Sequence, residues 1–253
     1  HGLRVAAMLT DPTYTIPPVP AGGPAVGIRW LRRTIARFTD GPDHTRRRRL
    51  ITEMLATVDV RALRDLAAER TRVLTGRSPD LVARIVPVEV LGQVLDFPPV
   101  PVEAVAVTAA AYQPGTGREE PADEAVAWLV EVFGGVPDEL TAAKISVLVQ
   151  AYAATAGLIR NAARAMRDGD ETIDAVLAET LRNDPPVRAT RRVAAGADPV
   201  IEVDLAANGI PFGAGPHQCP GRAHAMAIVA GVLAGMGNPN HNSPVRGTRS
   251  PRD

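Results

Sequence analysis

The sequence contains few cysteine, lysine and aromatic residues, and the shortage of cysteine excludes several classes of site. Only Cys219 carries a thiol among 253 residues, which excludes an intrachain disulfide and a multi-cysteine zinc site. A reducing cytoplasm is therefore the expected compartment. Aromatic residues make up 4% of the chain, and Lys144 is the single lysine among 28 basic residues. The formal net charge is zero, so bulk electrostatics give no reason to expect a nucleic-acid partner.

Long apolar segments are also missing. No run of about 18 apolar residues is free of charge, and we therefore expect no membrane-spanning segment. The first residues lack the apolar core of a secretory signal. Apolar residues account for 45% of the chain and charged residues for 22%, which is typical of a globular domain.

Apolar residues recur at helical spacing through most of the chain, whereas strand patterns are scarce. The clearest stripe lies in a predicted helix over 141–166, for which Thr141 is a candidate cap. The Pro- and Gly-rich segment 17–24 predicts a loop, and residues 97–120 predict no defined element. Further helices are predicted at 28–38, at 43–55 with Asp43 as cap, at 59–74, at 80–95 with a bend at Pro87, at 122–132, 172–182 and 222–234, and extended pieces at 191–193 and 201–204. We therefore expect one mainly α domain over 1–235 and a disordered tail over 236–253.

The stretch from Phe212 to Gly221, FGAGPHQCPG, is the most specific in the sequence. Its glycines permit tight turns and let a flat ligand approach the backbone closely. Cys219 precedes a predicted helix, where free N–H groups and the helix dipole favour a thiolate. A thiolate is the form of cysteine that binds iron. For an isolated cysteine, a buried free thiol would be the simpler interpretation.

This stretch resembles the heme-binding loop of the cytochrome P-450 superfamily, Phe-x-x-Gly-x-His/Arg-x-Cys-x-Gly, at every fixed position. The resemblance implies that Cys219 is the axial iron ligand of heme b and that Phe212 packs beside the ligand loop. It implies that His217 approaches a heme propionate and that Gly213 and Gly221 belong to the cofactor-binding loop. The expected fold is the mainly helical one of that superfamily, with small β elements.

Three more basic residues resemble the superfamily's propionate ligands. His44 and Arg48 are four apart and face the same way on a helix. Alone they would form a solvated basic patch. Beside a heme loop they resemble the His-x-x-x-Arg pair that meets both propionates, and Arg192 matches a later propionate-binding arginine, with Arg188 and Arg191 close by. Buried carboxylates need cationic donors, and arginine binds them in a bidentate manner.

Glu179 and Arg182 are three apart on one face of a predicted helix. An isolated pair of this kind would be a surface ion pair worth a few tenths of a kcal/mol. The resemblance implies instead a structural Glu-x-x-Arg pair, buried near the heme loop.

The predicted helix over 141–166 contains AYAAT, ending at Thr155, where the superfamily usually has Ala/Gly-Gly-x-Asp/Glu-Thr. The resemblance implies that Thr155 faces the oxygen site and takes part in proton delivery. The acid that normally precedes the threonine is absent, because residues 153 and 154 are alanines, and Tyr152 replaces a glycine. A threonine within a helix is otherwise most often structural.

The motifs occur in the superfamily's order, yet the chain lacks parts that members usually have. Few residues precede the arginine-rich segment, so part of the N-terminal sheet is expected to be missing. Residues 208–211 lead directly into the ligand loop without the usual meander, and a polar tail replaces the C-terminal sheet.

The resemblance implies a heme-dependent monooxygenase that acts on a small hydrophobic or secondary-metabolite substrate. Ferredoxin and ferredoxin reductase are the electron donors it implies, and Arg46, Arg47 and Arg49 could attract an acidic redox partner or simply be solvated. Two alternatives remain open. One is an auxiliary relative that binds heme weakly and assists a partner enzyme, and the other is peroxide-driven heme chemistry, which needs no acid–threonine relay.

Overall fold

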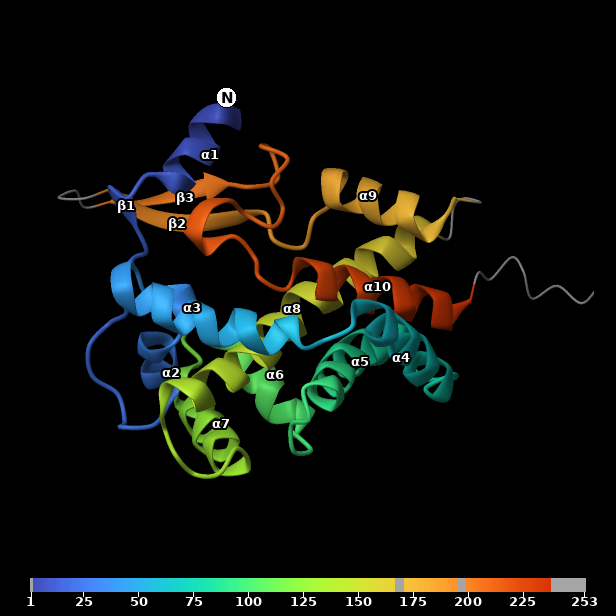
Figure 1. The fold of residues 1–253 in the computed structure, drawn as a ribbon, viewed down its shortest axis with the longest axis horizontal. Coiled ribbons are helices and arrows are strands. Elements are labelled where there is room, and N and C mark those ends of the chain that lie inside the picture. The colour runs from blue at the N-terminus through green and yellow to red at the C-terminus, as the bar shows by residue number, and fades with distance from the viewer. Residues whose placement is uncertain (1, 167–170, 195–198, 238–253) are drawn as a thin grey trace, which may run out of the picture.

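The computed structural model describes residues 2–166, 171–194 and 199–237. The described helices and strands, in chain order, are α1 Gly2–Thr10, β1 Tyr14–Thr15, α2 Ile28–Thr34, α3 Gly41–Ala56, α4 Val60–Val73, α5 Pro79–Val94, α6 Val102–Ala110, α7 Glu119–Val132, α8 Glu139–Met166, α9 Ile173–Asn183, β2 Ala189–Ala194, β3 Val200–Asp204 and α10 Arg222–Met236. Short 3-10 turns lie at Ala36–Phe38 and Gly215–His217. The expected mainly α fold with small β elements is confirmed (Figure 1).

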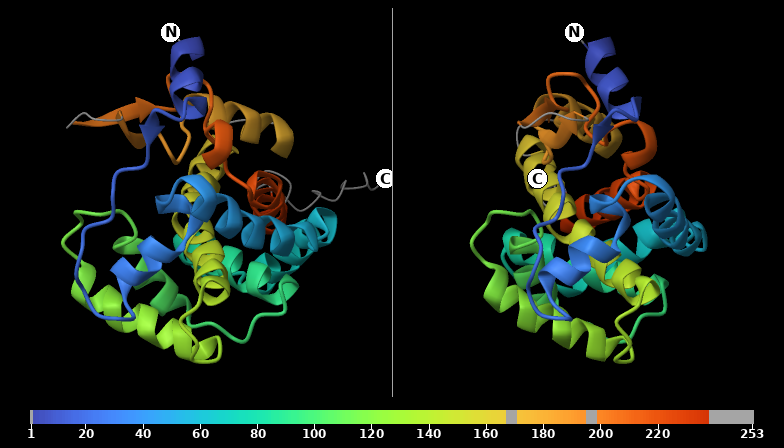
Figure 2. Two further views of the ribbon diagram at one scale, coloured as in Figure 1. Left: turned by 60° about the vertical axis from the view of Figure 1, so that its left-hand side comes forward. Right: turned by 90° about the vertical axis from the view of Figure 1, so that its left-hand side faces the viewer.

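Helix α8 is the centre of the fold. It packs against α5, α6, α9 and α10, and Figure 2 shows it crossing the molecule between the sheet at one end and α6 and α7 at the other. Its first half shares a buried cluster with α2, α6 and α7, and its second half shares another with α4, α5, α9 and α10. By length and composition α8 could cross a membrane, but 61% of that apolar window is buried inside the protein, as in the core helix of a globular domain.

The three strands form one antiparallel sheet in the order β1-β2-β3. On β2 the side chains alternate between faces, so Thr190 and Arg192 share a face while Arg191 lies on the other. Arg192 is buried and Arg191 is exposed, which shows that the first face is turned inward. Residues 205–211 then connect β3 directly to the ligand loop, as the sequence predicted.

Several predicted boundaries are wrong for local reasons. The helix expected over 28–38 is interrupted at Ile35, whose backbone is extended (φ −108°, ψ 156°), and resumes as a 3-10 turn. Helix α3 begins at Gly41 and not at the proposed cap Asp43, because Pro42 fits the first turn of a helix. Thr141 is not the cap of α8, since the Oδ1 atom of Asp138 accepts the hydrogen bond from its backbone N–H (2.8 Å).

Two helices were not predicted, α1 and α6. Helix α6 lies inside the Pro- and Gly-punctuated segment 97–120, where Pro101 precedes its first turn. Pro87 lies inside α5, as expected, and the predicted loop over 17–24 is confirmed. The proposed stop of α8 at 168–170 and residues 238–253 of the predicted tail lie outside the described residues.

Close packing between α10 and α4 sets the position of the helix that follows the ligand loop. A Cβ atom on Gly231 would overlap the backbone oxygen of Arg64, and one on Gly235 would lie 2.6 Å from the oxygen of Ala68. Glycine at these two positions therefore lets the helix backbones approach directly. This contact fixes α10 beside α8, with the ligand loop at its N-terminus.

A pair of glycine substitutions tests this packing. Glycine to alanine in a helix normally stabilises a protein by about 0.5–1 kcal/mol. At Gly231 the new methyl group meets backbone, so we expect Gly231→Ala to destabilise the protein by roughly 1–3 kcal/mol. Gly92 in α5 has open space at this position, so Gly92→Ala should stabilise. Urea unfolding of both variants measures the difference, and equal effects would contradict the proposed contact.

Candidate functional site

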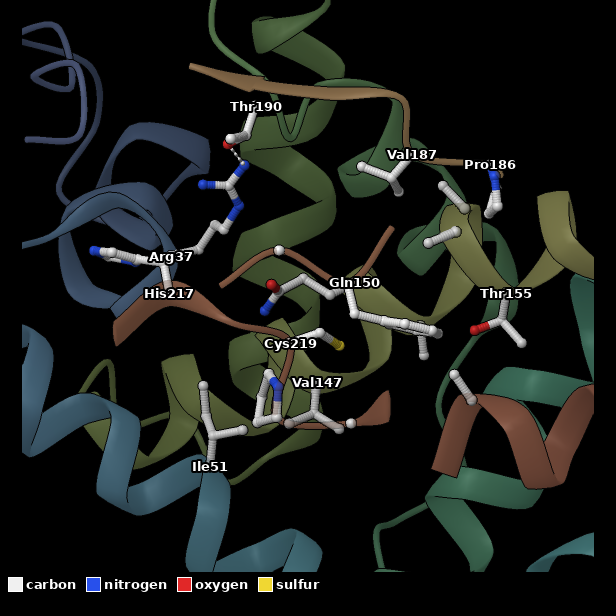
Figure 3. A pocket seen from close by; sticks show the side chains of 18 of the residues that line it. Arg37, Ile51, Val147, Gln150, Thr155, Pro186, Val187, Thr190, His217 and Cys219 are labelled. Atoms are coloured by element: carbon white, nitrogen blue, oxygen red, sulfur yellow. Dashed lines mark hydrogen bonds between the residues drawn. The ribbon is translucent and has the colours of Figure 1, made fainter. Parts of the chain in front are cut away.

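A cavity of about 430 Å³ lies between α8 and the ligand loop. Its walls are mainly apolar, with Ile51 from α3, Val147 from α8 and Val187 before β2 among them (Figure 3). Three arginines and three histidines also line it, namely Arg37, Arg48, Arg192, His44, His217 and His224. No aspartate or glutamate among the described residues lines this cavity.

Cys219 opens onto this cavity from the ligand loop (Figure 3). Its backbone N–H donates to the oxygen of Phe212 (2.9 Å), which closes the loop, and Gly213 and Gly215 adopt positive φ angles of 72° and 68° within it. A Cβ atom on Gly215 would meet the backbone of Leu9, so this glycine also allows α1 to pack on the loop. The loop thus presents one sulfur atom to the cavity.

The position of Cys219 before a helix led us to expect a thiolate, but its surroundings favour the protonated thiol. Burial raises the pKa of the Cys219 thiol, and the hydrogen bond from Gly221 and the charges of Arg48 and Arg222 oppose this only in part. Without a metal the group is therefore a thiol. A coordinated iron ion would itself supply the positive charge that makes the thiolate stable.

The four basic residues assigned to heme carboxylates come together although they are far apart in the sequence. His44 and Arg48 project from α3, Arg192 from β2 and His217 from the turn before Cys219, and all four line the cavity. The His44 and His217 rings lie 4.1 Å apart between centroids. Asp40 accepts a hydrogen bond from the Nε2 atom of His217 (3.0 Å), which orients this ring.

These residues fit a heme. The Nε2 atom of His44 is buried and has no hydrogen-bond partner among the described residues. Burial, together with the nearby His217 and Arg48, lowers the pKa of His44 to about 4, so the ring is neutral. An apolar cavity with one sulfur atom, an excess of cations and an orphaned histidine nitrogen suits a flat apolar cofactor that carries iron and carboxylates.

The remaining predicted residues of the ligand loop also line the cavity. Phe212 lies under the guanidinium of Arg222, 5.2 Å from the ring centroid, beside Cys219. Gly213 and Gly221 line the same cavity, and Gly221 is the residue before α10. Thr155 is 3% exposed and faces the cavity from α8, with Ala153 and Ala154 as neighbours.

The structure does not place Glu179 and Arg182 as expected. Both are exposed, and no ion pair joins them in the described part of the chain. The buried face of α9 consists of Val176, Leu177 and Thr180, which puts positions 179 and 182 on the opposite, solvent side. Glu179 accepts a hydrogen bond from Asn183 instead (3.3 Å). The predicted buried pair is therefore wrong.

Several polar residues of the cavity were not predicted, among them Arg37, Gln150, Thr190 and His224. Asp40, which holds His217, was not predicted either. Arg37 was not expected at the site because the sequence predicts one continuous helix over 28–38. Between Ser146 and Thr155, Gln150 and Tyr152 carry the only polar side-chain atoms. A glutamine that interrupts an apolar stripe could have indicated a site residue.

Comparisons with known proteins support the fold. No protein-family model matches the sequence, and no curated protein matches it. Ligand-free CYP164A2 of Mycobacterium smegmatis matches with a TM-score of 0.68 at 21% identity, over 91% of this chain and 80% of that one. A thermophilic cytochrome P-450 from Sulfolobus tokodaii matches with a TM-score of 0.67 at 19% identity, over 92% of this chain and 84% of that one.

A third similar structure is the cytochrome P-450 enzyme CxnD for C–S bond formation in chuangxinmycin biosynthesis. Its TM-score is 0.69 at 15% identity, and the match covers 91% of this chain and 77% of that one. The chain therefore has the cytochrome P-450 fold.

The low pKa of His44 predicts how stability depends on pH in the protein without heme. An unfolded chain protonates this histidine near pH 6.5, whereas the folded protein resists protonation until about pH 4. Since the unfolded state then binds more protons, stability should be full above pH 6.5 and fall as the pH drops towards 4. Urea unfolding at a series of pH values measures this loss, which His44→Gln should reduce. An unchanged pH dependence in His44→Gln would show that other groups cause it.

Proposed function

We propose that the protein binds heme through Cys219 and is a heme-dependent oxidoreductase, a monooxygenase that hydroxylates a small hydrophobic substrate. The observation that carries this proposal is the position of Cys219. This single thiol opens onto an apolar cavity with His44, Arg48, Arg192 and His217 on its wall. The cytochrome P-450 fold of the chain supports the same conclusion.

Bound heme would supply the iron that activates oxygen for insertion into a substrate. Cys219 would hold the iron from the side of the ligand loop. The guanidinium groups of Arg48 and Arg192 would bind the cofactor's carboxylates, and the neutral ring of His44 would donate a hydrogen bond to them, which together would fix its orientation. The apolar wall excludes water and favours a substrate without charge over most of its surface.

Proton delivery is the step that this chain's residues support least. Thr155 offers a hydroxyl group to the cavity, but the neighbouring Ala153 and Ala154 cannot accept or donate a proton. This favours peroxide-driven chemistry as a second candidate function, because peroxide brings its own oxygen and electrons and does not depend on the full relay.

Ferredoxin and ferredoxin reductase are the electron donors that we propose for the first function. The arginine run of α3 does not itself support docking of an acidic partner. Arg46 pairs with Asp43 and Glu139, Arg47 pairs with Glu139, and Arg49 pairs with Glu53. Their charges are thus largely compensated within the chain.

The carbon monoxide spectrum of the reduced, heme-loaded protein tests the proposed ligation. We expect the strongly red-shifted Soret band that a thiolate ligand produces, and Cys219→Ala should lose it. The chain has no second cysteine that could take over as ligand. A band of the same position and intensity in Cys219→Ala, at matched heme content, would disprove ligation by Cys219.

The missing acid beside Thr155 predicts poor use of electrons. With a reductase as donor, we expect most electrons to leave as hydrogen peroxide, and Ala154→Asp should lower the ratio of peroxide released to electrons consumed. Ala165→Asp, on an exposed position of the same helix, is the control. Both variants should be compared at equal heme occupancy. A low peroxide ratio in the parent, with no change in Ala154→Asp, would show that another group carries the proton.

A further inference from the structure

Two arginines of the cavity share a single hydrogen-bond acceptor. The Nη2 atom of Arg37 and the Nη1 atom of Arg192 each donate to the Oγ1 atom of Thr190, both at 3.3 Å. Arg37 comes from the 3-10 turn after α2, whereas Arg192 and Thr190 come from the inward face of β2. Figure 3 shows Arg37 reaching Thr190 beside His217. The hydroxyl group therefore holds two like charges close together at one end of the cavity.

No carboxylate pairs with either guanidinium within 4 Å in the described part of the chain. Among the described residues, Arg192 has one further acceptor, the backbone oxygen of Arg191 (2.8 Å). Asp40 is the acidic side chain on this side, but its two oxygen atoms already accept from His217 and from the backbone N–H of Ile16. The negative charge of Asp40 stabilises the Arg192 guanidinium only in part, so the described residues do not fully compensate the repulsion between the two arginines.

Arg32 shows how the same fold treats an arginine that has a structural role. It is 0% exposed, forms an ion pair with Glu119, and donates to the backbone oxygens of Ala111, Tyr112 and Gln113. Arg37 lies five residues later and has one acceptor, a neutral hydroxyl, within the described ranges. Burying a guanidinium with so few partners is unfavourable unless a ligand supplies the missing charge.

We propose that Arg37 and Arg192, held together by Thr190, form a carboxylate-binding site in the cavity, in which Arg37 is a binding residue. This proposal rests on the proposed function in one respect only, namely which molecule carries the carboxylate. That group belongs either to heme, next to His217, or to the substrate. In both cases it lies between two guanidinium groups, each of which can donate in a bidentate manner.

Binding of iron-free protoporphyrin IX tests the site without any role for Cys219 ligation. Titration is followed by porphyrin fluorescence in the parent, in Arg37→Gln and in the control Arg33→Gln. Arg33 is exposed and donates only to the backbone oxygens of Pro20 and Gly22 and so lies outside the cavity. If the carboxylate is that of heme, Arg37→Gln should weaken binding about tenfold or more, and Arg33→Gln should not. The dimethyl ester of protoporphyrin should bind the parent and Arg37→Gln equally.

A second experiment measures the binding of palmitic acid and 1-hexadecanol through their displacement of a fluorescent fatty-acid probe. If the carboxylate is that of a substrate, Arg37→Gln should weaken the binding of palmitic acid about tenfold. The affinities for hexadecanol and for protoporphyrin IX should not change. Arg37→Lys keeps the positive charge and should retain part of the affinity. Melting curves of each variant show whether it remains folded.

The site is disproved if Arg37→Gln binds both carboxylate probes as tightly as the parent. It is also disproved if Arg33→Gln loses the same affinity, or if the folded parent binds neither probe. Loss of thiolate ligation alone would contradict the proposed function and leave these results unaffected.

Discussion

Positive charge without acidic partners at one end of an apolar cavity is the constraint on which the site depends. Arg37, Arg48 and Arg192 line the cavity, and no described aspartate or glutamate does. Asp40 orients His217 from outside this lining and offsets the charge of Arg192 only in part. In a low-dielectric environment such an excess is unfavourable until an anion binds. The cavity is therefore built for a ligand that is apolar over its body and carries carboxylates at one edge.

The rest of the fold holds this arrangement in place. Helix α8 forms one wall, and the glycine contact of α10 with α4 positions the ligand loop opposite it. The inward face of β2 brings Arg192 to the cationic end, and α3 brings His44 and Arg48. Residues from four separate segments thus meet because the helices cross over α8, and none of them is placed by local structure alone.

The sequence predicted the ligand loop and the cationic residues because both occur in fixed local patterns. The spacing of Cys219 and His217 within one loop, and of His44 and Arg48 on one helix, is visible without the fold. Arg37 was not predicted, because an interruption at Ile35 turns its side chain towards β2. The burial of Glu179, which the resemblance implied, was wrongly predicted, because tertiary packing decides which side of α9 faces solvent.

Iron K-edge X-ray absorption of the heme-loaded protein tests the central claim most directly. If Cys219 holds the iron, the ferric protein should show one sulfur atom among the nearest neighbours of iron. This sulfur should be absent in Cys219→Ser at the same heme content, because the chain has no other cysteine. An iron environment of nitrogen and oxygen atoms alone in the parent, or a sulfur neighbour that persists in Cys219→Ser, would contradict the account.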